Sequence, residues 1–203
     1  MAPPGENRTK LIEAMKALSL SNGYSATTVD NVCARAKVSK GSFYHYFATK
    51  EEIGSAALGS YFDELTDSLT NGTFEHHTDP VDRLLGFIEH TRNVISQPQM
   101  VNGCLIGSYS LDLADTFPAI QSQLTKRFGE LEQFVGQLVD DASNASGIAL
   151  PSHRLSYQFI VAVEGSIVLA KAHADKSLLS SGIELFGDHI KLLLQTDSST
   201  NRN

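Results

Sequence analysis

Residues 27–52 read TTVDNVCARAKVSKGSFYHYFATKEE, and this stretch decides the fold. Thr28 is a favourable helix cap, and the pattern after it predicts a helix from Val29 to Ala36. After a short turn, Ser39 predicts the cap of another helix of about two turns. Two helices joined in this way are typical of a helix-turn-helix, whose second helix enters the major groove of DNA.

The second of these helices has an apolar face and a polar face. Phe43 and Phe47 are four residues apart, so they lie on one side, which we expect to be buried. The hydrogen-bonding groups on the other side suit DNA contact, although such a face can also be a plain polar surface. At phosphates we expect Thr28, Tyr44 and Lys50. At base edges we expect Lys40, Ser42 and His45. The whole predicted DNA-binding set is Thr28, Lys40, Gly41, Ser42, Tyr44, His45, Tyr46 and Lys50.

Helical periodicity continues on both sides of this stretch, and strand alternation is nearly absent. An apolar stripe that starts at Leu11 predicts a first helix, which stops at Asn22-Gly23. Thr49 and Glu52 form a capping box that opens a helix of about 20 residues. Further apolar series predict helices after Asp79-Pro80, from Phe117 to Leu138, after Pro151 and from Leu178 to Leu193. We therefore expect an all-α protein with a polar, frayed tail from Thr196 to Asn203.

The chain has 203 residues and a net charge of −7, but this charge is unevenly distributed. Seven Lys or Arg residues between Arg8 and Lys50 outnumber Glu13 and Asp30, so this stretch carries +5. From Glu51 onward twenty acidic residues outnumber nine basic ones, which gives −11. The asymmetry predicts an anion-facing N-terminal part and a body that does not touch DNA.

The sequence predicts a cytoplasmic protein without membrane contact. A membrane-spanning helix needs about 20 apolar residues, and the longest mainly apolar run, Phe159 to Ala170, is shorter and contains Glu164. The N-terminus lacks the cationic and then apolar order of a secretory signal. We expect no disulfide between Cys33 and Cys104, because a chain of this length builds a core without one.

The motif in residues 27–52 resembles the DNA-binding domain of the TetR family of bacterial repressors. The resemblance implies about nine helices, with a helix-turn-helix DNA-binding domain at 1–50 and a ligand-binding and dimerisation domain at 51–203. It also implies a homodimer that binds a palindromic double-stranded DNA operator and is released by an unknown small-molecule effector. Lys37 stands where the family usually has glycine in the turn, and a left-handed residue other than glycine costs roughly 1 kcal/mol.

Two segments of the body, NGCLIGSYSLDLA at 102–114 and EGSIVLAK at 164–171, resemble the TetR subgroup that contains NemR and AcuR. These are sensors of electrophiles or small unsaturated metabolites, and in NemR-like proteins the sensing thiol is a cysteine at the position of Cys104. Asn102 is a candidate cap that would place Cys104 in the first helical turn, where the helix dipole stabilises a thiolate. The alternative is a buried, unreactive thiol, which is what we expect of Cys33.

Aromatic and polar residues of the body are candidates for an effector cavity, or alternatively plain core. Glu164 differs from the rest, because a carboxylate among apolar residues must be paired, protonated or facing a ligand. The predicted ligand or sensing set is Cys104, Tyr61, Phe87, His90, Tyr109, Phe128, Phe159 and Glu164, with Phe117 as a further candidate.

We expect no metal, no cofactor and no enzymatic activity. His76, His77 and Asp79 are metal-ligand types, but they lack partners at helical spacing, which favours a solvated loop. The sequence has no Gly-rich phosphate loop, nucleophile elbow or zinc-binding helix motif. The alternatives to a ligand-released repressor are a DNA-binding protein without an effector and a helical small-molecule-binding protein that does not bind operators.

The last two helices predict the dimer interface. From about Leu155 to Leu194 the apolar residues are too broadly spaced for one intramolecular seam. Small residues that allow close helix packing occur at Gly165, Ser166, Ala170 and Gly182. We expect an isologous four-helix interface with two helices from each subunit.

Overall fold

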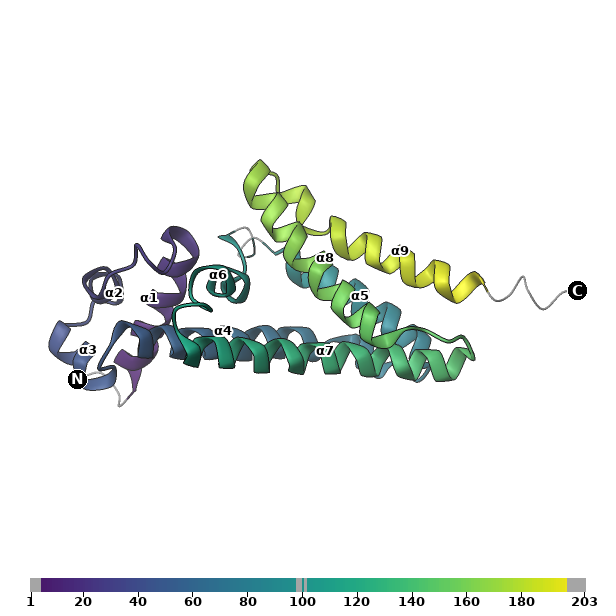
Figure 1. Cartoon of the computed structure of the whole chain (residues 1–203), viewed down its shortest axis with the longest axis horizontal. Helices are drawn as coiled ribbons and strands as arrows, with labels where there is room; N and C mark the ends of the chain where they lie inside the picture. Colours follow the sequence, from purple (N-terminus) through teal and green to yellow (C-terminus); the bar gives the residue numbers. More distant parts are fainter. Residues whose placement is uncertain (1–4, 98–99, 101, 197–203) are drawn as a thin grey trace, which may run out of the picture. The chain divides into compact units, whose positions relative to one another are not determined.

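The computed structural model describes residues 5–97, 100 and 102–196, with only the backbone of Thr196. In this part of the chain there are nine α-helices and no strand, so the predicted all-α fold is confirmed (Figure 1). The helices are α1 (Glu6–Asn22), α2 (Val29–Ala36), α3 (Lys40–Tyr46), α4 (Lys50–Thr70), α5 (Pro80–Ile95), α6 (Leu105–Asp112), α7 (Pro118–Ser146), α8 (Ser152–His173) and α9 (Ser181–Thr196). The tail that was expected to fray lies outside the described residues, apart from Thr196.

The contacts divide the chain into two compact units. Unit 1 comprises Met1–Leu65 and Asn102–Arg127, and unit 2 comprises Thr66–Val101 and Phe128–Asn203. Helices α4 and α7 contribute residues to both units. These units group residues by their contacts and do not test the predicted division at residue 50 into a DNA-binding and a ligand-binding domain. That division stays a prediction.

In unit 1, α2, α3 and α6 all pack against α1. The centre of this packing is apolar, and Leu11, Met15, Phe43 and Ile53 are completely buried. Polar contacts join the parts of α4 and α7 that belong to this unit. The Ser55 hydroxyl donates to Gln123 Oε1 at 2.9 Å, and Arg127 pairs with Asp63 at 2.9 Å.

The end of α1 and the starts of α2, α3 and α4 lie where the capping residues predict them. Thr28 accepts a hydrogen bond from the Asn31 N–H and Ser39 from the Ser42 N–H, which fixes the starts of α2 and α3. Gly23 follows α1 with φ 83°, the left-handed region that glycine adopts without strain. At α4 the Thr49 hydroxyl accepts from the Glu52 N–H, but the Glu52 carboxylate accepts from Ala48 N–H, one residue before the usual capping-box partner.

In unit 2, a chain of aromatic rings forms the core. Phe87 of α5 lies 5.3 Å from Phe159 of α8 and 5.5 Å from Phe134 of α7, measured between ring centres. Phe159 in turn lies 5.7 Å from Phe186 of α9. Neighbouring α8 and α9 pack side by side (Figure 1). The ring contacts join α5, α7, α8 and α9.

Two details of the predicted helices are wrong. Cys104 is the N-cap residue of α6, so it precedes the first turn instead of lying in it, and Asn102 does not cap this helix. Leu178 belongs to a separate 3-10 turn, Lys176–Leu179, whose start is capped by Asp175. Asp175 accepts a hydrogen bond from the Ser177 N–H, and this local bond stabilises the turn. Leu178 therefore lies in the turn, and α9 begins only at Ser181.

The prediction that no segment could span a membrane needs correction on one count. By length and composition α8 is apolar enough to cross a bilayer. Long helices of other proteins pass the same test when they pack in a core, and Leu155, Phe159, Ile167 and Ala170 of α8 are buried inside unit 2.

Candidate nucleic-acid interface

Helix α3 turns its apolar side inward and its polar side outward. Phe43 is completely buried, and Phe47, directly after the helix, is nearly so. The side chains of Lys40, Tyr44 and His45 are exposed, as is Gly41, whereas Ser42 and Tyr46 are partly buried. Of the three residues predicted to contact bases, the structure therefore leaves Lys40 and His45 accessible, whereas Ser42 is partly buried.

The Lys40 ammonium already has a partner, the Asp30 carboxylate of α2, at 2.6 Å. The hydrogen bond with Asp30 and its negative charge raise the Lys40 pKa. Both side chains are largely exposed, so the pair contributes little to stability. A DNA base that accepts a hydrogen bond from Lys40 has to compete with Asp30.

Thr28 is committed to capping α2. Its hydroxyl accepts from the Asn31 N–H at 3.1 Å and donates to Asn31 Oδ1 at 2.7 Å. The Thr28 N–H also donates to Asn31 Oδ1. A phosphate that accepts a hydrogen bond from the Thr28 hydroxyl therefore replaces Asn31 Oδ1 as its acceptor.

The start of α1 supports α3 from the side. Asn7 Nδ2 donates to Ser42 Oγ at 3.4 Å, and the Arg8 guanidinium lies 5.4 Å from the Phe47 ring centre. Arg8 thus adds positive charge beside α3. The sequence pattern did not single out Asn7 or Arg8 as partners of α3, because pairs of residues 35 or more positions apart become neighbours only in the fold.

The turn between α2 and α3 contains Lys37, which stands where the TetR family usually has glycine. Lys37 has φ 55° and ψ 43°, so it is left-handed as the glycine at this position in the family implies. Its N–H bonds to the carbonyl groups at the end of α2, which offsets part of the strain.

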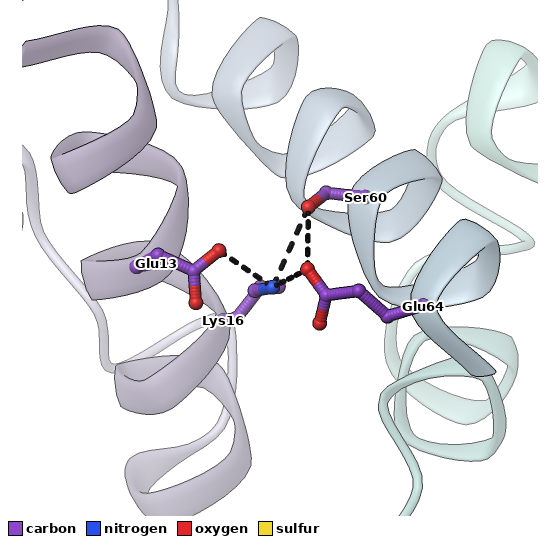
Figure 2. Close-up of polar contacts among 4 residues, drawn as sticks. All are labelled: Glu13, Lys16, Ser60 and Glu64. Carbon is purple, nitrogen blue, oxygen red and sulfur yellow. Dashed lines mark hydrogen bonds and ion pairs between the residues drawn. The ribbon is translucent and has the colours of Figure 1, made fainter. Parts of the chain in front are cut away.

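A buried lysine joins α1 to α4 (Figure 2). Lys16 Nζ lies 2.6 Å from Glu13 of α1 and 2.6 Å from Glu64 of α4, and it donates to Ser60 Oγ at 3.4 Å. The Lys16 side chain is 7% exposed, whereas both carboxylates are mostly exposed. Lys16 follows Ile12 by four residues, so its place on the buried side of α1 could have been inferred from the periodicity.

The predicted effector residues fall into both units. In unit 1, Cys104 is 4% exposed and Tyr61 is partly buried. Tyr109 of α6 is buried, and its hydroxyl shares a hydrogen bond with Ser19 of α1 at 3.0 Å. Burial raises the Tyr109 pKa far above its ordinary value, although the bond with Ser19 acts in the opposite direction.

The other candidates lie in unit 2. Phe87 and Phe159 meet in the aromatic core described above. His90 hydrogen-bonds the Ser68 carbonyl oxygen at 2.7 Å, and Phe128 and Glu164 are partly buried. The structure thus brings Phe87 and Phe159 together, and their role toward an effector stays a prediction.

The histidine loop before α5 has structural roles. Asp79 caps α5 by accepting from the Val81 and Asp82 N–H groups, and the Arg83 guanidinium donates to the His77 carbonyl oxygen. Within the described residues, no group of three or more His, Cys, Asp or Glu side chains could hold a metal ion.

Two family models match the chain. Residues 11–57 match the model for bacterial regulatory proteins of the tetR family, and residues 80–186 match the model for the tetracyclin repressor-like C-terminal domain. The first match contains the helix-turn-helix, and the second covers about half of the chain.

Similar proteins are transcriptional regulators. The HTH-type transcriptional repressor NemR of Escherichia coli K12 is 30% identical over 125 residues, which are 60% of this chain and 61% of NemR. The transcriptional regulator AcuR of Cereibacter sphaeroides is 28% identical over 170 residues, 82% of this chain and 77% of AcuR. A crystal structure of the regulatory protein TetR from Rhodobacter sphaeroides superposes with a TM-score of 0.78 at 25% identity, covering 90% of this chain and 98% of that one.

Proposed function

Because the chain belongs to the TetR family of transcriptional regulators, we propose that it is a repressor that binds a palindromic operator as a homodimer and is released by a small-molecule or electrophile effector. The observation that carries this proposal is the exposed polar face of α3, capped by Ser39 and backed by the buried Phe43. A bacterial operator lies in the cytoplasm, so we place the protein there.

DNA binding is supported by the arrangement of α2 and α3. One short recognition helix reads only a few base pairs, so useful specificity requires two copies on a two-fold site. We assign base contacts to Lys40, Ser42 and His45. The phosphate contacts are assigned to Thr28, Tyr44 and Lys50.

The homodimer is supported by an exposed apolar surface on α8 and α9. Monomers rarely expose several large apolar side chains on neighbouring helices. The exposed side chains on these two helices are Tyr157, Val161, Val168, Leu169, Leu185 and Leu192. A groove of about 760 Å³, lined by Tyr157, His189 and Leu193 among others, opens on the same two helices.

Effector release requires that the effector bind the DNA-incompetent arrangement more tightly than the DNA-competent one. Two routes are open in the body: occupation of an apolar cavity or modification of Cys104. The burial of Cys104 means that an electrophile reaches it only when the structure around it opens locally.

The proposal is tested by selecting operators for the purified full-length protein from random DNA. We expect one enriched palindrome. If each subunit neutralises three or four phosphates, log K should fall against log salt with a slope near −6, at roughly −0.9 per phosphate. Lys50→Ala should weaken binding to all sequences, and His45→Ala should change the preference among them.

The alternatives predict other results. A DNA-binding protein without an effector would select the palindrome but keep it in the presence of every compound in a metabolite and electrophile panel. A helical ligand-binding protein would bind compounds but select no DNA. A salt slope near zero would contradict the phosphate contacts.

A further inference from the structure

The Lys50 ammonium at the start of α4 lies against an aromatic ring. Its Nζ is 4.1 Å from the ring centre of Tyr24, and it donates a long hydrogen bond of 3.5 Å to the Ser25 carbonyl oxygen. A cation over a ring face is attracted by the negative potential of that face. Partial burial lowers the Lys50 pKa, which agrees with an ammonium held close to the protein surface.

Tyr24 is itself held firmly within unit 1. The side chain is 5% exposed, and its ring makes edge contacts with Tyr109 at 5.5 Å and Phe117 at 6.1 Å. On the α4 side the ring lies so close to Gly54 that a Cβ there would be 2.8 Å from Tyr24 Cε2. The ring therefore has little freedom to move away from Lys50.

We propose that Tyr24 is a positioning residue that holds the Lys50 ammonium in place for its contact with an operator phosphate. This inference rests on the proposed DNA-binding function and adds a residue to it. Lysine has one of the most mobile side chains, and it loses this freedom when it binds a phosphate. A lysine side chain that the Tyr24 ring already restricts loses less conformational freedom when it binds a phosphate, so the phosphate contact becomes stronger.

The test changes the electrostatic potential of the ring face at position 24 and largely keeps the shape of the ring. Tyr24 is replaced by phenylalanine and, through an unnatural amino acid, by 3,4,5-trifluorophenylalanine, whose ring face attracts cations poorly. Operator affinity of the full-length protein is measured by fluorescence anisotropy over a range of salt. We expect parental affinity for Tyr24→Phe and a loss of about three- to tenfold for the fluorinated ring.

Two controls connect the effect to Lys50. In a Lys50→Met background the difference between the two rings should disappear, because there is no cation to position. The same fluorinated residue at Phe117, whose ring lies T-shaped against the Tyr24 ring, should leave affinity unchanged. The proton resonances of the Lys50 ε-methylene, shifted upfield by the parental ring, should stay shifted in Tyr24→Phe.

Equal affinity of the phenylalanine and trifluorophenylalanine proteins would overturn the inference. A fluorine effect that persists without Lys50 would also overturn it, since the ring would then act through packing. An unshifted ε-methylene in the parent protein would overturn the geometry itself. Failure of the parent to select any palindrome would instead overturn the proposed function and, with it, this role of Tyr24.

Discussion

At the scale of single residues, the pair between Lys40 and Asp30 decides how much positive charge α3 offers to DNA. The ammonium and the carboxylate are 2.6 Å apart and both exposed. Asp30→Asn releases Lys40 and removes an anion from the side of the protein that we propose faces DNA. We expect affinity for random DNA to rise about threefold, which is the scale of an exposed ion pair. The measurement is fluorescence anisotropy with random-sequence duplexes.

Asp188→Asn is the matched control for this change. Asp188 is likewise an exposed aspartate beside a lysine, Lys191, but it lies on α9. The control should leave DNA affinity unchanged. Weaker random-DNA binding by Asp30→Asn would show that Asp30 is needed to orient Lys40, and unchanged binding would show that the pair does not limit DNA contact by Lys40.

The two cysteines are a second question at this scale. Burial, and then the charge of Asp30, raise the Cys33 pKa, so at pH 7.5 Cys33 holds less of the reactive thiolate than an ordinary cysteine. Both thiols are buried, at 6% and 4% exposed, so N-ethylmaleimide reaches either one only through local opening. We expect Cys104, at the N-terminal end of α6, to be labelled before Cys33, with loss of operator binding. Mass spectrometry of digested protein measures both sites. If Cys104→Ser still loses operator binding on treatment, the effector acts without a covalent bond to this thiol.

At the scale of helices, α8 and α9 approach each other closely at Gly182. Its N–H donates to Ser166 Oγ at 2.8 Å, and a Cβ at Gly182 would lie 2.2 Å from the Ala162 carbonyl oxygen. Gly182→Ala should lower the free energy of unfolding by about 2–3 kcal/mol or more, because a backbone atom has to move. Urea unfolding at one fixed protein concentration measures it.

The control for this change is Gly129→Ala in α7, where a Cβ meets no atom within 4 Å. That substitution should raise stability by about 0.5–1 kcal/mol, because alanine is the better helix former. Equal effects of the two substitutions would contradict the close approach of α8 and α9.

The Lys16 cluster between α1 and α4 gives a second prediction for helices. Lys16→Met removes the buried cation and leaves two exposed carboxylates, which water can solvate, so we expect a loss of about 1 kcal/mol or less. The double variant Glu13→Gln and Glu64→Gln leaves the buried ammonium without a carboxylate, and we expect about 2 kcal/mol or more. Urea unfolding distinguishes the two, and the reverse order would contradict a buried cation.

At the scale of the whole molecule, the apolar surface of α8 and α9 leads to a prediction about assembly. Leu185 is 70% exposed within the protomer, so Leu185→Asp should split the proposed dimer without disturbing the core. Sedimentation velocity should give a monomer, and operator affinity should fall with it. Ile167 is a poor choice for this test, because it is 4% exposed and a charge there would unfold unit 2.

Leu111→Asp provides the control, since Leu111 is a highly exposed leucine on α6 in unit 1. It should remain a dimer and bind the operator. A Leu185→Asp protein that sediments as the parent does would place the interface elsewhere.

The sequence by itself determined the elements and the kind of surface that α3 presents. Caps such as Thr28 and Ser39 and the spacing of Phe43 and Phe47 act within one or two helical turns, so they can be read without knowing the fold. The same reasoning predicted the starts of α4 and α5, whereas the question of a left-handed Lys37 came only from the family resemblance. Local reasoning placed the start of α6 two residues too early, because Asn102 is a better cap than Cys104 on local grounds.

Only the tertiary structure decided which distant residues meet. Tyr24 under Lys50, Lys16 against Glu64 and Tyr109 against Ser19 join residues that are 26, 48 and 90 positions apart. Periodicity shows that a side chain faces inward, but not which helix it faces. The close approach at Gly182 likewise depends on the tertiary structure. The sequence shows only that the residue is small, and the packing of α9 against α8 leaves no room for a Cβ there.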